Sequence, residues 1–313
     1  MTRHAITIGA TLMLLCSLSG PLYGWGSATH SYIVHEAGAK QGPASLQETY
    51  GAILPDVFNL AFGDPHQGHL ATLTHSEFTK VVQAAASDTE KSLAYGFASH
   101  NEAWGADQTA HIGSVNDPDS GYVIRKSDAL VAALRPQVRL FLLLNNVPAS
   151  DAVLDETLPG VAHTAVETAI DLLVCQKEDP DASQRLVMAA RTQGWAAPAL
   201  LCKAYVGDLV AEAGITEAVA APLIIAAETD FRTQITSYGT ALSQANAVDA
   251  LAEQGVELAK RLLAAQQGII VDIPADLMKQ ILNTAIDAVK DDYGLELAAT
   301  VAQVRGELES HGI

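Results

Sequence analysis

Apolar residues recur at spacings of three and four along most of the chain, whereas the alternation of apolar and polar residues that is typical of strands is nearly absent. Gly, Pro, Asn and Asp separate the periodic stretches and so predict where helices end. The pattern therefore predicts an all-α fold. The expected helices cover residues 92–104, 130–145, 162–176, 184–192, 199–213, 216–247, 248–267 and 275–310.

Two stretches in the first half interrupt this pattern. Residues 52–74 contain Pro55 and Pro65 as well as two glycines, so they cannot form one regular helix. Residues 116–121, with the sequence NDPDSG, predict a solvated turn. The acidic residues of this turn are similar to those of a calcium loop, but the twelve-residue ligand pattern and its closing Glu are missing.

The first 24 residues have the pattern of a signal peptide. Arg3 and His4 precede an apolar stretch at residues 5–18, and small or turn-forming residues lead to an expected cleavage after Gly24. We therefore expect a secreted or periplasmic protein. Cys16 lies inside the apolar stretch without the small residues that precede a lipoprotein cysteine, so a lipid anchor is not expected.

The composition is acidic, with 36 Asp and Glu against 18 Lys and Arg and a formal net charge of −18. This charge disfavours sequence-independent binding of duplex nucleic acid, which needs a basic patch, but it does not exclude a nucleic-acid substrate held by metal ions. Two cysteines lie outside the leader, Cys175 and Cys202. In an oxidising compartment they could form a disulfide, or they could be two buried thiols on separate helices.

Candidate chemistry lies in the first part of the chain, because no His follows His163 until His311. We therefore expect a catalytic domain at residues 25–180. Residues 181–313 would form a C-terminal helical region that packs on it.

The stretch from 95 to 111 carries the first candidate site. On one continuous helix, His100, Asp107 and His111 would lie within roughly 40° of one another. Asp is a weak helix former and Gly105 costs about 1 kcal/mol relative to Ala, so packing alone does not explain this face. Two His and one Asp on a helix are by themselves more often surface chemistry or a satisfied polar core. The further His, Asp and Glu residues of this chain favour a metal site.

Further His residues occur in similar surroundings, next to small residues on or beside apolar segments. Glu167 follows His163 by one helical turn, and such a pair can bind one cation together. His35 is expected at the surface, and His66 and His69 either at the surface or against a substrate. The candidate ligands from the residues themselves are His30, Asp56, His75, His100, Asp107, His111, His163 and Glu167.

The order of these residues resembles the zinc-dependent phospholipase C family, over about residues 25–175. The resemblance implies an all-α bundle shared with the fungal single-strand nucleases, up to three zinc ions in a cleft, and an N-terminal Trp that binds zinc through its amino group and carbonyl. The residues that carry it are Trp25-Gly26, His30, Pro55-Asp56, Thr74-His75, Gly96, His100, Asp107, His111, His163 and Glu167.

The resemblance also implies three ligand sets, and Asp107 belongs to the first and the third of them. The sets are Asp56, His75, His100 and Asp107 for the first zinc, His111, His163 and Glu167 for the second, and Trp25, His30 and Asp107 for the third.

The spacing departs from the family in two places. One is the gap from His111 to His163, which is much longer here than in the family, and the other lies between His100 and His111. Six residues separate His100 from Asp107, where the family has three, and the step from Asp107 to His111 is shorter. An insertion of three residues returns Asp107 close to the same helical face. Glu102 would compete as a ligand if the helix broke at Gly105.

The function that the resemblance implies is hydrolysis of a phosphodiester by a metal-activated water, with Asp56 as ligand and general base. A phospholipase C would make transient contact with a membrane surface, for which Phe58, Leu60 and Phe62 are candidates unless they belong to the core. One alternative is a single-strand nuclease, although only 5 % of the residues are aromatic and could stack on bases. The other is a catalytically inactive zinc-binding helical protein.

Overall fold

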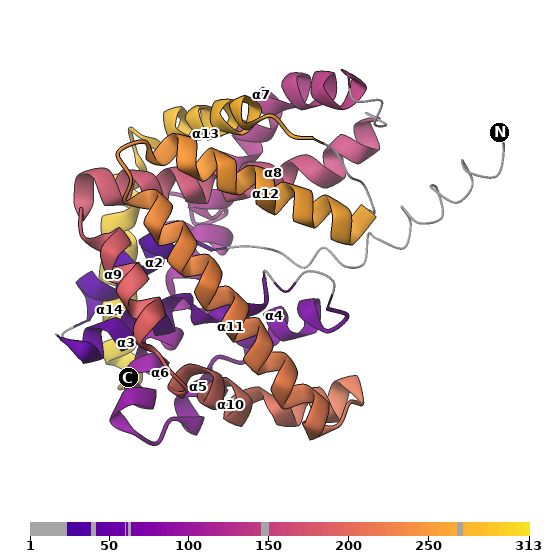
Figure 1. The fold of residues 1–313 in the computed structure, drawn as a ribbon. Helices are drawn as coiled ribbons and strands as arrows, with labels where there is room; N and C mark the ends of the chain where they lie inside the picture. The colour runs from indigo at the N-terminus through magenta and orange to yellow at the C-terminus, as the bar shows by residue number, and fades with distance from the viewer. Residues whose placement is uncertain (1–23, 39–41, 60, 62–63, 145–149, 268–271) are drawn as a thin grey trace.

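The computed structural model describes residues 24–38, 42–59, 61, 64–144, 150–267 and 272–313, and these form helices and no strand (Figure 1). The all-α prediction is confirmed. Of the expected leader, only Gly24 is among the described residues. Leu60 and Phe62 also lie outside the described residues. The helices are α2 (Ser27–Ala37), α3 (Pro43–Ile53), η1 (Leu54–Phe58), α4 (Gln67–Ser76), α5 (Thr79–Ala84), α6 (Asp88–His100), η2 (Gln108–Ile112), α7 (Tyr122–Leu144), α8 (Asp151–Leu173), η3 (Val174–Glu178), α9 (Ala182–Thr192), α10 (Ala196–Ala213), α11 (Glu217–Leu242), α12 (Ala247–Gln267), α13 (Ala275–Val289) and α14 (Tyr293–His311).

The predicted helices of the second half are found, with one correction. The segment 275–310 is two helices, α13 and α14, because the chain turns between them at residues 290–292. In this turn Asp292 accepts a hydrogen bond of 2.6 Å from the Tyr122 hydroxyl and pairs with Lys126, so the turn is fastened to α7. Residues 52–74 are divided among α3, η1 and α4, as their prolines predict, and residues 116–121 form the expected turn.

Helices α3 and α6 pack with their backbones in contact. A methyl group at Gly96 would lie 2.0 Å from the Glu48 carbonyl oxygen, and one at Gly51 would lie 2.1 Å from the Leu93 carbonyl oxygen. Only glycine permits this approach. The close packing fixes the end of α6 against α3, and that end carries His100.

The first turn of α6 is held by a capping box. The Ser87 hydroxyl accepts from the Glu90 backbone N–H, and the Glu90 carboxylate accepts from the Ser87 N–H. Lys203 of α10 also pairs with Glu90, and these contacts lower the pKa of Glu90 to about 2. Both ends of α6 are therefore tied to neighbouring elements.

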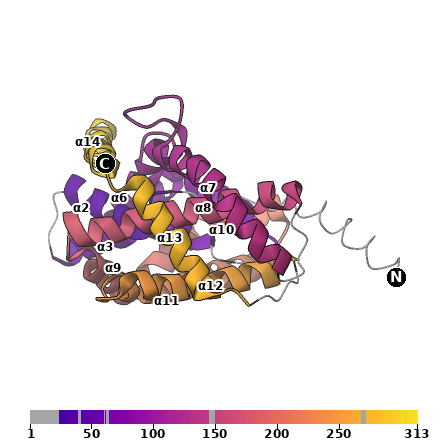
Figure 2. The ribbon, with the colours of Figure 1, turned by 90° about the horizontal axis from the view of Figure 1, so that it is seen from above.

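The C-terminal helices pack on the first half of the chain. Helix α11 lies against α9, α10 and η1, α13 against α8 and α7, and α14 against α2 and α6 (Figures 1 and 2). Helix α8 with η3 is long and apolar enough to cross a membrane between Thr157 and Glu178, the one such stretch among the described residues. Within this stretch, 67 % of the most apolar window is buried inside the fold, and α8 packs against α7, α13 and α2, as a core helix does.

We expect Gly96→Ala to lower the free energy of unfolding by roughly 3 kcal/mol or more, because the added methyl group would push α3 and α6 apart. Gly207→Ala is the control. Gly207 lies in α10 with nothing within 4 Å of the added methyl group, so alanine should stabilise the helix by up to about 1 kcal/mol. Urea denaturation followed by circular dichroism measures both. Equal stability of Gly96→Ala and wild type would contradict the close packing.

Candidate metal centre

The carboxylate of Asp107 lies at the centre of a cluster of imidazoles. Its Oδ1 is 3.2 Å from His30 Nε2, and its Oδ2 is 3.0 Å from His100 Nε2, 3.6 Å from His75 Nε2 and 4.0 Å from His111 Nδ1. The side chain of Asp107 is fully buried. Four helical elements of the bundle thus each place an imidazole next to the Asp107 carboxylate.

The route by which Asp107 reaches this position differs from the prediction of one helix over residues 95–111. Helix α6 ends at His100, and the Asn101 side-chain oxygen accepts from the N–H groups of Ala103 and Trp104 in a tight turn. A methyl group at Gly105 would lie 2.6 Å from the Asn101 backbone, so this glycine serves the turn. A folded-back turn therefore brings His100 and Asp107 together.

Backbone carbonyls set the orientation of two imidazoles. His100 Nδ1 donates to the Ala52 carbonyl and His75 Nδ1 donates to the Ala71 carbonyl, each at 2.7 Å. The Nε2 atoms are therefore free to face the carboxylates, which is the usual arrangement of metal-binding His. His75 Nε2 and His100 Nε2 lie 3.4 and 3.7 Å from Asp56 Oδ1, so these three residues could hold one metal ion.

A second group lies on the α8 side of the cluster. His163 Nε2 is 2.9 Å from Glu167 Oε1, and the His111 ring centre is 5.5 Å from that of His163. His111, His163 and Glu167 each offer a ligand atom within 4.8 Å of the others. The predicted i, i+4 pair on α8 is thus found, and His111 joins it.

The metal-free cluster carries strongly shifted pKa values. Burial would lower the pKa of His100, but the carboxylates of Asp107 and Asp56 outweigh it and raise that pKa to about 9. Burial lowers the pKa of His163 to about 4 and raises that of Glu167 well above its ordinary value. Burial would raise the pKa of Asp107, but the neighbouring imidazoles hold it well below the ordinary range.

The side chain of Trp25 points away from the cluster. Its indole stacks on Tyr122 and donates from Nε1 to the Ala106 carbonyl at 3.0 Å and to the Thr109 hydroxyl at 3.1 Å. The backbone just before it does reach the cluster. A methyl group at Gly24 would lie 2.7 Å from Asp107 Oδ1. Only the backbone of this segment could therefore act as a ligand.

Asp171, which was not among the residues predicted from the sequence, positions one of the elements of the cluster. It is buried on α8 and accepts hydrogen bonds from the N–H groups of Ala28 and Thr29, from the Thr29 hydroxyl and from the Tyr238 hydroxyl, at 2.6 to 2.9 Å. These bonds fasten the start of α2, which carries His30. The spacing could have identified it, since Asp171 follows Glu167 by one further turn on the same face.

The remaining candidates lie outside the cluster. His35 is exposed, as expected, and His69 Nε2 is 3.3 Å from Glu212 rather than near the cluster. Phe58 belongs to the buried core, so it is not part of a surface approach. Both Cys175 in η3 and Cys202 in α10 are free thiols.

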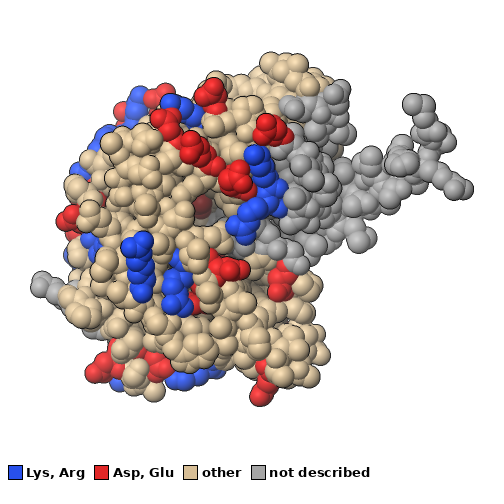
Figure 3. All heavy atoms as spheres, in the orientation of Figure 1, with Lys and Arg blue, Asp and Glu red and all other residues tan. Residues whose placement is uncertain are grey.

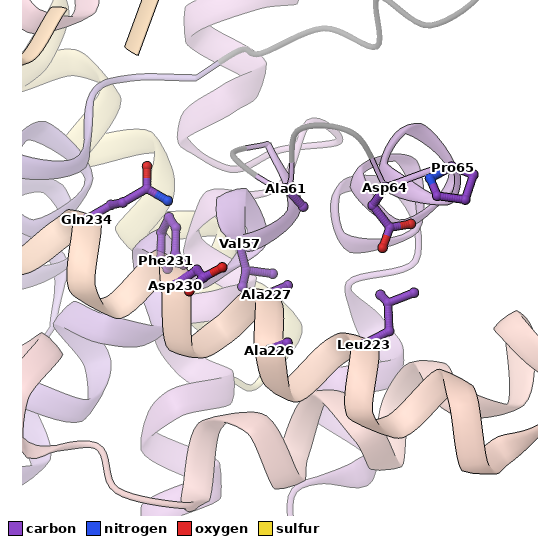
Figure 4. A pocket seen from close by; sticks show the side chains of 10 residues that line it. All are labelled: Val57, Ala61, Asp64, Pro65, Leu223, Ala226, Ala227, Asp230, Phe231 and Gln234. Atoms are coloured by element: carbon purple, nitrogen blue, oxygen red, sulfur yellow. The ribbon is translucent and has the colours of Figure 1, made fainter. Parts of the chain in front are cut away.

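A separate groove of about 380 Å³ lies between η1 with the chain after it and α11 (Figure 4). Its lining is mainly apolar, with Asp64 and Asp230 among the few polar groups. None of the cluster residues lines it, although Val57 of the groove directly follows Asp56. We therefore assign the chemistry to the buried cluster.

The chain matches no family model, and no curated protein and no solved structure matches it either. The buried His, Asp and Glu groups could hold a metal ion on their own geometry.

In the metal-free protein, we expect the free energy of unfolding to fall as pH rises from 6.5 to about 9. The pKa of His100 in the folded state, about 9, lies above its ordinary value of 6.5, so protonated His100 stabilises the fold. This contribution to the free energy of unfolding is fully present below pH 6.5 and is lost as the pH rises to about 9. The loss should be on the order of 3 kcal/mol. The raised pKa of Glu167 acts in the same direction. Urea denaturation of chelator-treated protein at both pH values measures the loss.

His100→Asn should remove most of this pH dependence. His35→Asn, at an exposed position, is the control and should retain it. Equal stability of the metal-free wild type at the two pH values would contradict the raised pKa of His100.

Proposed function

We propose that the protein is an exported zinc-dependent phosphodiester hydrolase, a phospholipase C that uses a metal-activated water. One observation carries the proposal. Asp107 is fully buried, and its two oxygens face different imidazoles, His30 from Oδ1 and His100 from Oδ2. A carboxylate in this position is suited to bridge two cations, and zinc prefers a mixed set of imidazole and carboxylate ligands.

Buried polar atoms without hydrogen-bond partners are a second reason to place a metal ion in the cluster. Both oxygens of Asp107 and the Nε2 atoms of His30 and His100 are buried without a hydrogen-bond partner in the described structure. Unsatisfied buried polar atoms are rare in native proteins, because each one costs free energy. Cations bound on the two sides of the Asp107 carboxylate would satisfy these atoms.

Up to three zinc ions would be held by three ligand sets, two of which share the central carboxylate of Asp107. These sets are Asp56, His75, His100 and Asp107; His111, His163 and Glu167; and His30, Asp107 and the backbone of Trp25.

A zinc centre supplies Lewis acidity and lowers the pKa of water towards neutrality. Asp56 is the carboxylate suited to take a proton, because its side chain is 18 % exposed whereas that of Asp107 is fully buried. Asn59 Nδ2 donates to Asp56 Oδ1 at 2.7 Å and holds the carboxylate in place. His75 and His100 keep their Nε2 atoms directed at Asp56 through their bonds to backbone carbonyls.

The surroundings of the cluster favour a lipid over a single-stranded nucleic acid. Trp25 and Tyr122 are buried and stack on each other, and Trp104 stacks on His311. These rings are therefore occupied and do not offer platforms for bases. The large apolar side chains of Ile112 and Val115 are exposed just after His111, where they could touch a membrane surface.

The surface charge is consistent with a lipid substrate rather than a nucleic acid. Acidic and basic side chains are interspersed over the described part of the face drawn in Figure 3. With a net charge of −18, the protein is not expected to bind duplex nucleic acid.

We expect His100→Ala and Asp107→Ala each to lower the zinc content of the exported protein and to slow hydrolysis of a phosphatidylcholine analogue by at least about 100-fold. His35→Ala should change neither quantity, because His35 is exposed and outside the cluster. Elemental analysis and a phosphatidylcholine assay measure both effects. Equal losses in all three variants would contradict the ligand assignment.

The same assay separates the alternatives. Zinc with cleavage of single-stranded DNA alone would identify a nuclease. Zinc with turnover of neither substrate would identify a metal-binding protein without catalysis.

A second prediction concerns the N-terminus. If the free amino group of Trp25 is a ligand, a protein that retains Met or a tag before Trp25 should lose one zinc and most activity. The physical reason is that Gly24, the residue before Trp25, lies against the cluster. Its N–H donates to Glu167 at 3.0 Å. Elemental analysis of tagged and correctly processed protein tests this role, and full zinc with full activity in the tagged form would rule it out.

A further inference from the structure

Glu102 is a carboxylate that the three proposed zinc sets do not use. It belongs to the turn between His100 and Asp107, where this chain has three residues more than the phospholipase C spacing. Its Oε1 lies 3.8 Å from His111 Nδ1, and the same nitrogen lies 4.0 Å from Asp107 Oδ2. Glu102, Asp107 and His111 each offer a ligand atom within 4.8 Å of the others.

We propose that Glu102 is a metal ligand at the solvent side of the cluster, where it joins Asp107 and His111 and so extends the ligand set of His111, His163 and Glu167. The inference rests on the proposed metal centre and adds a ligand to it. Asp107 supports it independently, because this fully buried carboxylate has no hydrogen-bond partner in the described structure and is directed at the same position.

The position of Glu102 is fixed by its turn. The Asn101 side-chain oxygen accepts from the N–H groups of Ala103 and Trp104, the two residues after Glu102. The Trp104 ring packs against Phe78 and His311. A ligand on a turn that is fixed in advance loses little conformational entropy when it binds.

The exposure of Glu102 indicates what this position does. Its side chain is 40 % exposed, whereas that of Asp107 is fully buried and that of His111 nearly so. A cation at this position would face water on one side, as catalytic metal sites do when they keep a coordination position for water or substrate. Glu102 therefore marks the side from which a phosphate oxygen approaches the cluster.

Glu102→Gln tests the proposal, because it keeps the shape of the side chain and removes its charge. In the exported protein, dialysed against zinc, the variant should lose about one zinc per chain or bind its weakest zinc at least about 10-fold less tightly. Glu36→Gln is the charge-matched control on α2, where Glu36 is exposed, and it should bind zinc as the wild type does. Glu102→Asp should recover part of the loss.

Elemental analysis gives the zinc count, and titration with Co²⁺ followed by visible absorption reports on the ligands directly. The unfolding midpoints of the metal-free proteins serve as the folding control and should agree. Wild-type zinc affinity and an unchanged Co²⁺ spectrum in Glu102→Gln would overturn the role of Glu102 and leave the proposed function intact. A wild type that binds no zinc would overturn both.

Discussion

The structure depends on the buried charge of Asp107. A carboxylate removed from water costs several kcal/mol unless charges or dipoles of the protein compensate it. Here the compensation comes from His30, His75, His100 and His111, which belong to four different helical elements. The bundle must therefore bring the ends of these elements to one point, and much of its irregular packing follows from this requirement.

Three devices hold those ends in place. The glycines of α3 and α6 allow the backbone contact that fixes His100, and the Ala52 carbonyl orients its ring. Asp171 holds the first turn of α2, which carries His30. Helix α14 supports the segment after Asp107, since Thr300 bonds to Thr109 at 2.9 Å and buried Glu296 accepts from the Val115 N–H at 2.7 Å. The last helix of the chain, far from any candidate ligand in sequence, is thus part of the support of the site.

Helical periodicity was enough to predict the fold class and most helices, because amphipathic segments such as α7 and α13 bury one apolar face. Periodicity did not predict the turns whose backbone conformation is set by polar side chains. The side chain of Asn101 ends α6 after His100, and Asp292 fastens the turn between α13 and α14. Short helices such as α2 escaped prediction because buried polar residues, His30 among them, interrupt their apolar pattern. The cluster residues could be predicted as candidates from their types and spacing, but their convergence depends on turns and tertiary hydrogen bonds that no local pattern contains.

Anomalous scattering would show whether Asp107 bridges two metal ions, as we propose. Crystals of the processed protein, grown with zinc and measured on both sides of the zinc absorption edge, would locate each ion. We expect anomalous peaks on both sides of the Asp107 carboxylate, one of them beside Asp56, His75 and His100. If the density around Asp107 in such crystals contained no zinc and its oxygens were bonded only to imidazoles, Asp107 would not be a metal ligand and the cluster would be a buried ionic core.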